Sequence, residues 1–203
     1  MCGRYDLSST PAAIRARFKV PEVPEFAPNS DLRPTELAPI VRVSRDGVRE
    51  CVLARWGLVP AWAKDLAYGS RCFNARAETA ATLPSFRGAF RKRRCLVPVD
   101  AFYEWTGERG HKTKWRIACD EPSPFALAGL WEWWRDPEAP EASAVETYTI
   151  LTTAANSAIA PLHERMPVIV PLERHAEWLS TTGDDAGLLA GLDAERVRIT
   201  GPV

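Results

Sequence analysis

The chain has 203 residues, 46% of them hydrophobic and 26% charged, which is the balance of a globular domain with one core. That balance excludes a disordered tail, a collagen-like rod and a coiled coil. The formal net charge is zero, but residues 1–100 hold 17 Lys and Arg against 10 Asp and Glu, whereas residues 101–203 hold 9 against 16. This uneven distribution of charge could give the folded protein a basic face that binds a polyanion. Alternatively, residues of both halves could lie side by side on the surface, so that the charges balance locally.

The first half of the chain predicts few regular elements. Thr10 and Pro11 are typical of an N-cap and a first helical residue, so a short helix begins at Pro11. Residues 21–39 carry five prolines and predict an irregular, extended segment. A hairpin over 38–56 turns at Asp46-Gly47, a structured loop follows over 56–65, and a basic helix is expected over 85–94.

The second half has the β-branched and aromatic content of strands over 95–105, 114–119, 125–134, 146–153 and 166–170. Residues 135–145 predict an exposed acidic loop. Helices are expected over 154–162 and, as one or two helices, over 171–191. These elements predict a single α+β domain over residues 1–203, with a largely antiparallel, strongly curved sheet flanked by helices.

The five cysteines lie at positions that favour neither a zinc site nor a disulfide framework. Successive cysteines are 49, 21, 23 and 24 residues apart, none of which is the spacing of a zinc knuckle, and their number is odd. Cys51, Cys72, Cys95 and Cys119 have apolar or strand-like neighbours and are expected to be small core residues.

Cys2 differs because removal of Met1 leaves its thiol beside a free α-amine. The reference pKa values of the amine, about 7.7–8.0, and of the thiol, about 8.5, keep both partly deprotonated near neutral pH. The thiol could attack a carbonyl with the amine as base. Alternatively, the amine condenses with an aldehyde and the thiol closes a thiazolidine ring. A Cys with no function that merely follows Met1 is the plain alternative.

Three internal motifs carry groups suited to chemistry. The segment NARAET (74–79) offers the amide of Asn74 and the guanidinium of Arg76, and a polar turn is its ordinary interpretation. Glu104 follows the basic run 91–94 and lies among aromatic residues, where desolvation raises the pKa of a carboxyl group toward that of a proton shuttle. A solvent-facing Glu104 is the alternative. His163 precedes a predicted strand, where an imidazole reaches a ligand or fills a structural role.

The remaining histidines and the tryptophans divide into core and surface. His111 and His175 are interpreted as structural, His111 in a polar turn and His175 on a surface helix. Trp56, Trp62 and Trp105 lie beside Gly, Pro or Glu104, so they are either core residues or exposed faces on which unpaired bases stack. Core positions are expected for Trp131, for Trp133 or Trp134, and for Trp178.

In this order the strings MCGRY, WGLVPAW, NARAET, RRCLVPVDAFYEW and HERMPVIV resemble the SOS-response-associated peptidase (SRAP) family, the abasic-site processing proteins. The likeness spans residues 2 to about 179. It implies a barrel-like antiparallel sheet and a basic groove for single-stranded DNA. It also implies a peptidase that removes residues ahead of the Cys; here only Met1 precedes it, so ordinary trimming is enough.

The resemblance assigns roles to particular residues. It implies that Cys2 forms a thiazolidine with the ring-opened aldehyde of an abasic site and that Asn74 positions the sugar or the amine. Glu104 would shuttle protons, and His163 would assist ring opening and reversal. It implies that Arg4, Arg76 and Arg165 contact phosphates and that the Trp105 ring packs against the stacked bases. Arg71, Arg87 and residues 91–94 are further candidate phosphate contacts, and the acidic segments 132–146 and 173–195 are expected away from the groove.

We therefore expect a DNA-damage response protein that crosslinks to abasic sites in single-stranded DNA, with β-elimination at the site as a side activity. It is expected to act without metal or organic cofactor, as a monomer in the cytoplasm that is nucleoid-associated when bound to DNA. Two alternatives stay open. One is an N-terminal-nucleophile amidotransferase, although its further Gly/Asn motifs are missing. The other is a non-covalent single-strand binder whose affinity falls steeply with salt.

Overall fold

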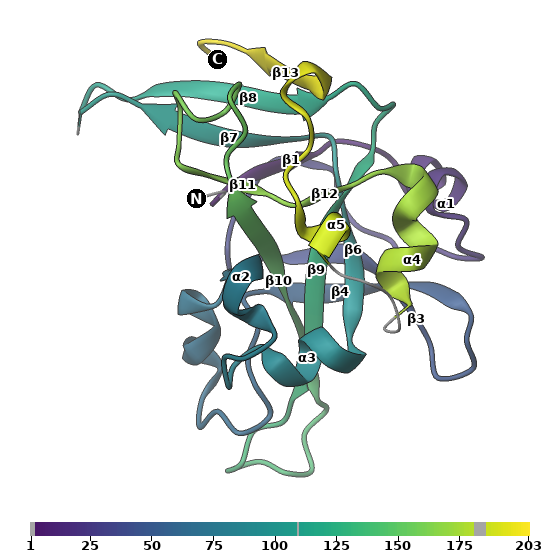
Figure 1. Ribbon diagram of the computed structural model, residues 1–203. Coiled ribbons are helices and arrows are strands. Elements are labelled where there is room, and N and C mark those ends of the chain that lie inside the picture. The colour runs from purple at the N-terminus through teal and green to yellow at the C-terminus, as the bar shows by residue number, and fades with distance from the viewer. Residues whose placement is uncertain (1–2, 109, 181–185) are drawn as a thin grey trace.

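The structure is a computed structural model that describes residues 3–108, 110–180 and 186–203 (Figure 1). Its strands are β1 (Tyr5–Leu7), β2 (Asn29–Leu32), β3 (Leu37–Val43), β4 (Arg49–Trp56), β5 (Asn74–Arg76), β6 (Arg94–Val99), β7 (Ala101–Thr106), β8 (Thr113–Cys119), β9 (Phe125–Trp134), β10 (Val145–Ala154), β11 (Arg165–Pro167), β12 (Ile169–Val170) and β13 (Val197–Thr200). Its α-helices are α1 (Pro11–Phe18), α2 (Ala77–Ala80), α3 (Arg87–Lys92), α4 (His175–Leu179) and α5 (Ala186–Leu189), and 3₁₀ turns cover Leu66–Arg71, Leu172–Arg174 and Ala194–Arg196.

The strands form two sheets, one of which closes on itself. Strands β10, β4, β3, β6 and β9 follow one another, and β9 pairs back with β10, so these five make a barrel-like ring. Within that ring only β10 and β4 run parallel. The second sheet has the order β13-β8-β7-β1-β2. The predicted α+β class with a curved, barrel-like, largely antiparallel sheet is therefore confirmed.

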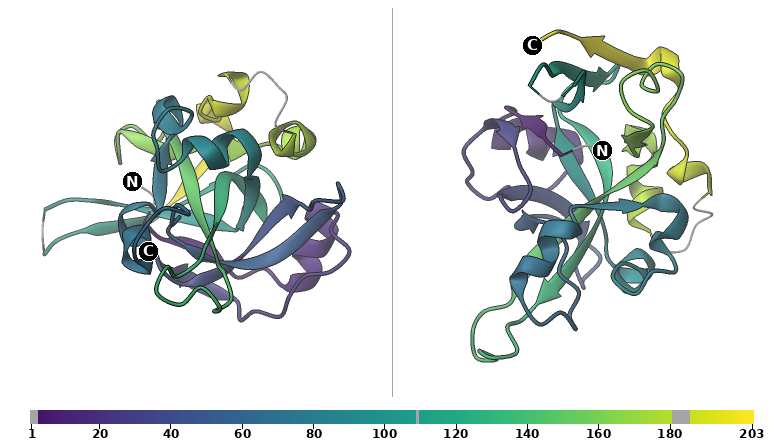
Figure 2. Two further views of the ribbon diagram at one scale, coloured as in Figure 1. Left: turned by 90° about the horizontal axis from the view of Figure 1, so that it is seen from below. Right: turned by 90° about the vertical axis from the view of Figure 1, so that its left-hand side faces the viewer.

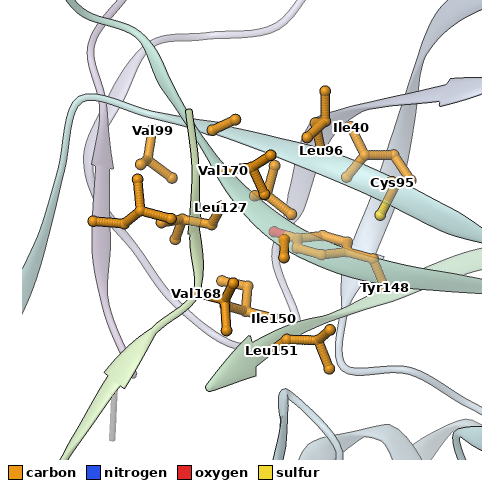
Figure 3. Close-up of a cluster of buried hydrophobic side chains, with 14 of the residues drawn as sticks. Ile40, Cys95, Leu96, Val99, Leu127, Tyr148, Ile150, Leu151, Val168 and Val170 are labelled. Carbon is orange, nitrogen blue, oxygen red and sulfur yellow. The ribbon is translucent and has the colours of Figure 1, made fainter. Parts of the chain in front are cut away.

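The ring encloses the core. Figure 3 shows Ile40 of β3, Leu96 of β6, Leu127 of β9 and Ile150 of β10 pointing toward one another, and all four are fully buried. Alternation along each strand directs these side chains inward. Burying one such aliphatic side chain stabilises the fold by about 1.5–3 kcal/mol. The ring is thus a packed support for the segments at its rim.

Two local predictions from the first half are confirmed by their hydrogen bonds. Helix α1 starts at Pro11, and the hydroxyl of Thr10 accepts a bond from the backbone N–H of Ala13 at 3.3 Å. Strands β3 and β4 form the expected hairpin, and Gly47 has a φ of +79° in its turn. Glycine adopts this left-handed conformation without the steric cost of a Cβ atom.

The predicted strand over 95–105 is two strands in different sheets. β6 belongs to the ring and β7 to the second sheet, with a break at Asp100. The carboxylate of Asp100 accepts bonds from the N–H and hydroxyl of Ser9 at 2.7 and 2.6 Å, and the Asp100 N–H donates to the carbonyl of Asp6 at 2.7 Å. These bonds turn the chain from one sheet into the other. The segment 166–170 also contains two strands, but both belong to the sheet of the ring, where β11 pairs with β10 and β12 with β9.

The helix expected over 154–162 is absent, and residues 157–162 form turns. Asn156 caps the first of these turns, because its Oδ1 accepts the N–H groups of Ala158 and Ile159, each at 3.0 Å. Its Nδ2 donates to the carbonyl of Leu192 at 2.7 Å. Pro161 limits the turns that follow, because it has no backbone N–H and disfavours the helical conformation of the residue before it. The result is a loop that leads directly to His163.

Burial corrects two further expectations. Trp56 is fully buried, stacks on Tyr148 with ring centroids 6.3 Å apart, and is a core residue rather than an exposed face. His175 lies on a buried face, not on the surface, and stacks on Phe18 at 5.3 Å. Burial lowers the pKa of His175 to about 4, which agrees with the structural role expected of this residue.

The acidic loop over 135–144 joins β9 to β10 and projects from one end of the ring (Figure 2). The other end of β10 pairs with β11. No helix in the described ranges is long and apolar enough to cross a membrane.

Candidate functional site

At the C-terminal end of β10, two segments that are distant in sequence pair with this strand. Asn74 of β5 pairs with Ile150, and Arg76 with Thr152, on one edge of β10. On its other edge, Arg165 of β11 pairs with Ala154. The ring therefore brings the NARAET and HERMP motifs together around one strand end, as their resemblance to one family implies. Figure 1 shows β11 above the end of β10 and α2 beside it.

The guanidinium of Arg165 connects the two motifs directly. It donates to both carboxylate oxygens of Glu78 at 2.7 and 2.8 Å, and to the carbonyl of Thr152 at 2.6 Å. These bonds hold the pKa of Glu78 below its usual range. Arg76, the other guanidinium of this cluster, is exposed at the start of α2. Arg165 is thus oriented by the protein, whereas Arg76 faces solvent.

Glu104 lies inside the second sheet. It sits on β7 opposite Trp115 of β8 and is 4% exposed. Burial raises the pKa of Glu104 above its ordinary value, although the electrostatic effect of neighbouring groups, His163 among them, opposes the shift. A carboxyl group with such a pKa gives up its proton closer to neutral pH than an exposed one. The expected desolvated Glu104 is therefore present.

His163 follows the turns over 157–162 and is half-buried. The backbone N–H of Arg165 donates to its Nδ1 at 2.9 Å. Because Nδ1 accepts this bond, the neutral imidazole carries its proton on Nε2. The ring lies close enough to Glu104 to influence the pKa of that carboxyl group. The carboxyl group of β7 and the imidazole of the loop before β11 therefore lie near each other.

Next to Glu104 along β7, the ring of Trp105 contacts the guanidinium group of Arg4. Successive residues of a strand point to opposite faces, so Trp105 points away from the face that carries Glu104. Arg4 lies over the Trp105 ring, 5.4 Å from its centroid, and its Nη1 donates to both oxygens of Asp31 at 3.1 Å. The carbonyl of Arg4 accepts the N–H of Tyr103 at 3.0 Å. The start of the described chain therefore runs alongside the Glu104 segment.

The other predicted phosphate contacts have different environments. Arg71 and Arg87 are exposed, as is Trp62, which has 58% of its surface accessible. Arg94 is buried, donates to the carbonyl of Phe90 and packs over aromatic rings, so its assignment as a phosphate contact is wrong. The basic sequence 91–94 does not itself show that its last residue, Arg94, begins the buried strand β6.

Sequence reasoning missed Asp31 and Thr152. Asp31 orients Arg4 from 27 residues away, and Thr152 anchors Arg165 through its backbone carbonyl. Neither residue belongs to a motif that stands out in the chain. Only the pairing of strands brings them to the site.

Cys2 lies outside the described residues. The four other cysteines are the core residues that the sequence predicts, three buried and Cys51 half-buried. Burial raises the pKa of Cys51 to about 12 and that of Cys119 to about 11, and it also raises the pKa of Cys72 and Cys95. A thiol reacts as its thiolate, so these four are unreactive near neutral pH.

We accordingly expect iodoacetamide to alkylate one cysteine of the native protein at pH 8, namely Cys2. Peptide mass spectrometry after brief labelling measures this, and labelling in denaturant, which should modify all five, is the control. Fast native labelling of Cys51 or Cys119 would contradict the assigned burial.

The fold and this arrangement identify the class. The family model for SOS response associated peptidase (SRAP) matches residues 1–199, and the chain belongs to that family. The abasic site processing protein YoqW of Bacillus subtilis is 39% identical over 199 residues, covering 95% of this chain and 86% of that protein. The chicken abasic site processing protein HMCES is 30% identical, covering 88% of this chain and 65% of that protein.

Solved structures agree with the fold. A protein from Bacteroides thetaiotaomicron superimposes with a TM-score of 0.85 at 25% identity, covering 98% of this chain and 90% of its own. A protein from Bordetella bronchiseptica gives a TM-score of 0.84 at 28% identity and covers 98% of both chains.

Proposed function

We propose that this protein processes abasic sites in single-stranded DNA by joining Cys2 covalently to the ring-opened sugar. The observation that carries the proposal is the buried carboxyl group of Glu104, which lies near His163 and beside the segment that begins the described chain. Two relatives are named abasic site processing proteins, which supports DNA with such sites as the substrate. Capping the aldehyde shields the strand from breakage, which is a role in the DNA-damage response.

The proposed reaction balances without an oxidant or a cofactor. After Met1 is removed, the α-amine of Cys2 adds to the aldehyde carbon, and the new hydroxyl leaves as water when it receives a proton. The Cys2 sulfur then adds to the imine carbon, its proton passes to nitrogen, and a thiazolidine ring closes. One C–N bond and one C–S bond form, and one water is lost.

Glu104 and His163 take the two proton-transfer roles. The raised pKa of Glu104 suits a group that protonates the leaving hydroxyl near neutral pH. His163 presents Nε2–H because its Nδ1 is occupied by Arg165, and that proton suits opening of the sugar ring. Asn74, on the adjoining strand, positions the sugar or the amine by hydrogen bonds.

In this proposal, the cationic residues position the single-stranded DNA. Arg76 and Arg165 flank the end of β10, and Arg4 lies on the Trp105 ring, so phosphates on either side of the abasic site meet separate guanidinium groups. The Trp105 ring offers a face on which a neighbouring base stacks. An imine that fails to close is open to β-elimination, so strand incision accompanies the crosslink as a minor product.

The test is a denaturing gel of Met1-free protein with single-stranded DNA that carries one abasic site. We expect a slow band that survives heat and detergent without borohydride and is absent with unmodified DNA. A gel without that band overturns the covalent mechanism. Ammonia release from glutamine would then favour an amidotransferase.

A further inference from the structure

A cationic cleft lies at the opposite end of β10 from the candidate site. It has a volume of about 910 Å³, a size common among ligand sites, and Ala144, just before β10 begins, is part of its lining. Strand β10 is ten residues long, so at about 3.3 Å per residue the cleft and the Arg165 end lie roughly 30 Å apart. None of the predicted catalytic residues lines it.

The lining has an excess of positive charge. The cations come from β3, the β3–β4 turn, α3 and the end of β9, and Glu50 is the one carboxylate among the lining residues; the cations are Arg42, Arg45, Lys92, Arg93 and Arg135. Two of them are neutralised, because Arg42 pairs with Glu50 and Glu146, and Arg93 pairs with Glu132.

The other three cations keep their charge available. Arg45, Lys92 and Arg135 are exposed, and none of them forms an ion pair within the described ranges. Arg135 donates instead to the carbonyls of Pro140 and Ala142 at 2.7 and 2.9 Å, which hold its side chain without neutralising it. The cleft is therefore suited to an anion that carries several charges.

An aromatic surface stands among these cations. Trp133 is 37% exposed, and its ring packs edge-on against Trp131 with centroids 4.4 Å apart and an interplanar angle of 85°. Trp131 is in turn held by Arg42, which lies 3.9 Å from its centroid. Arg45 and Arg93 approach the Trp133 ring at 6.0 Å each. The orientation of the exposed ring is thus fixed by the protein.

We propose that this cleft is a second contact for single-stranded DNA, in which a base stacks on Trp133 and its phosphates meet Arg45, Lys92 and Arg135. A fixed aromatic face beside cations is the arrangement that single-strand binders use without reading sequence. The inference rests on the proposed function for its substrate and adds that the DNA strand extends along the ring to the end opposite the abasic site. It revises the expectation that all of segment 132–146 lies away from the DNA, because Trp133 and Arg135 belong to that segment.

Equilibrium binding of unmodified, fluorescently labelled single strands tests this without any crosslink. For a strand of about 16 nucleotides, Trp133→Ala should weaken binding about tenfold, since stacking contributes about 1–3 kcal/mol per base. Trp133→Phe, which keeps a ring, should retain most of the affinity. Arg45→Ala should reduce the dependence of log K on log salt by about one.

Controls separate this proposal from the proposed function. Arg15→Ala, on the exposed side of α1, should leave affinity and salt dependence unchanged. A strand of about 4 nucleotides with an abasic site should crosslink equally well to wild type and to Trp133→Ala, because it does not reach the cleft. Unchanged affinity of Trp133→Ala and Arg45→Ala for the long strand overturns the second contact, as does a cleft that binds only an acidic peptide.

Discussion

Cys2→Ala is expected to abolish the heat-stable adduct with abasic DNA and to leave reversible binding of the strand intact. Alanine is small enough that Met1 is still removed, so the variant keeps its α-amine and loses only the sulfur. The amine then stops at the imine, which hydrolyses when the protein is denatured. A denaturing gel without borohydride should therefore show no band, while borohydride should trap one.

The matched control is Cys51→Ala, which removes a half-buried thiol whose pKa burial raises to about 12. This variant should form the adduct at the wild-type rate. A stable adduct that persists in Cys2→Ala, or that is lost in Cys51→Ala, would contradict the assignment of Cys2 as the residue that forms the thiazolidine.

Glu104→Gln should slow adduct formation by about 10²–10⁴-fold, the usual contribution of a positioned general acid or base. The variant keeps the size and polarity of the side chain but holds no titratable proton. The wild-type rate should also show a titration above pH 4.3, the approximate ordinary pKa of a glutamate, because burial raises the pKa of Glu104. In Glu104→Gln that titration should disappear from the pH profile of the single-turnover rate.

Glu108→Gln is the control, because Glu108 is an exposed residue just beyond β7. It should change neither the rate nor the pH profile. A Glu104→Gln variant that binds DNA normally and reacts at the wild-type rate would show that Glu104 is a structural carboxyl group.

Local patterns predicted most of the strands and the α+β class. The β3–β4 hairpin and helix α1 rest on short-range signals, a Gly in the turn and a capping Thr, and both formed as expected. Closure of the ring did not follow from any such signal. It depends on β9 pairing with both β6 and β10, which are separated by about 50 residues of chain.

The errors arose where side chains compete with the backbone or where burial reverses a local pattern. Pro161 interrupts the helix expected after β10, and the side-chain bonds of Asp100 divide one predicted strand into two. Trp56 and His175 lie next to polar or turn residues, yet the packing of distant strands and helices buries both. Periodicity over a few residues does not contain this information.

The sequence proposed the residues of the candidate site, but it did not predict the contacts that they make. The order of the motifs identified Asn74, Glu104 and His163, whereas the bond between Arg165 and His163 emerges from the loop conformation. Contacts with Glu78, Thr152 and Asp31 orient the arginines and were not expected. Trp105 and Glu104 are neighbours in sequence, yet strand alternation directs them to opposite faces of β7.

The most direct test of the covalent mechanism is the intact mass of the unreduced adduct between the protein and a single strand with one abasic site. A thiazolidine at Cys2 predicts the mass of the Met1-free protein plus the DNA minus one water, with no gain of two hydrogens after borohydride treatment. Fragmentation should place the DNA on the N-terminal peptide. An adduct that retains Met1, gains two hydrogens on reduction or maps to an internal lysine would contradict the mechanism.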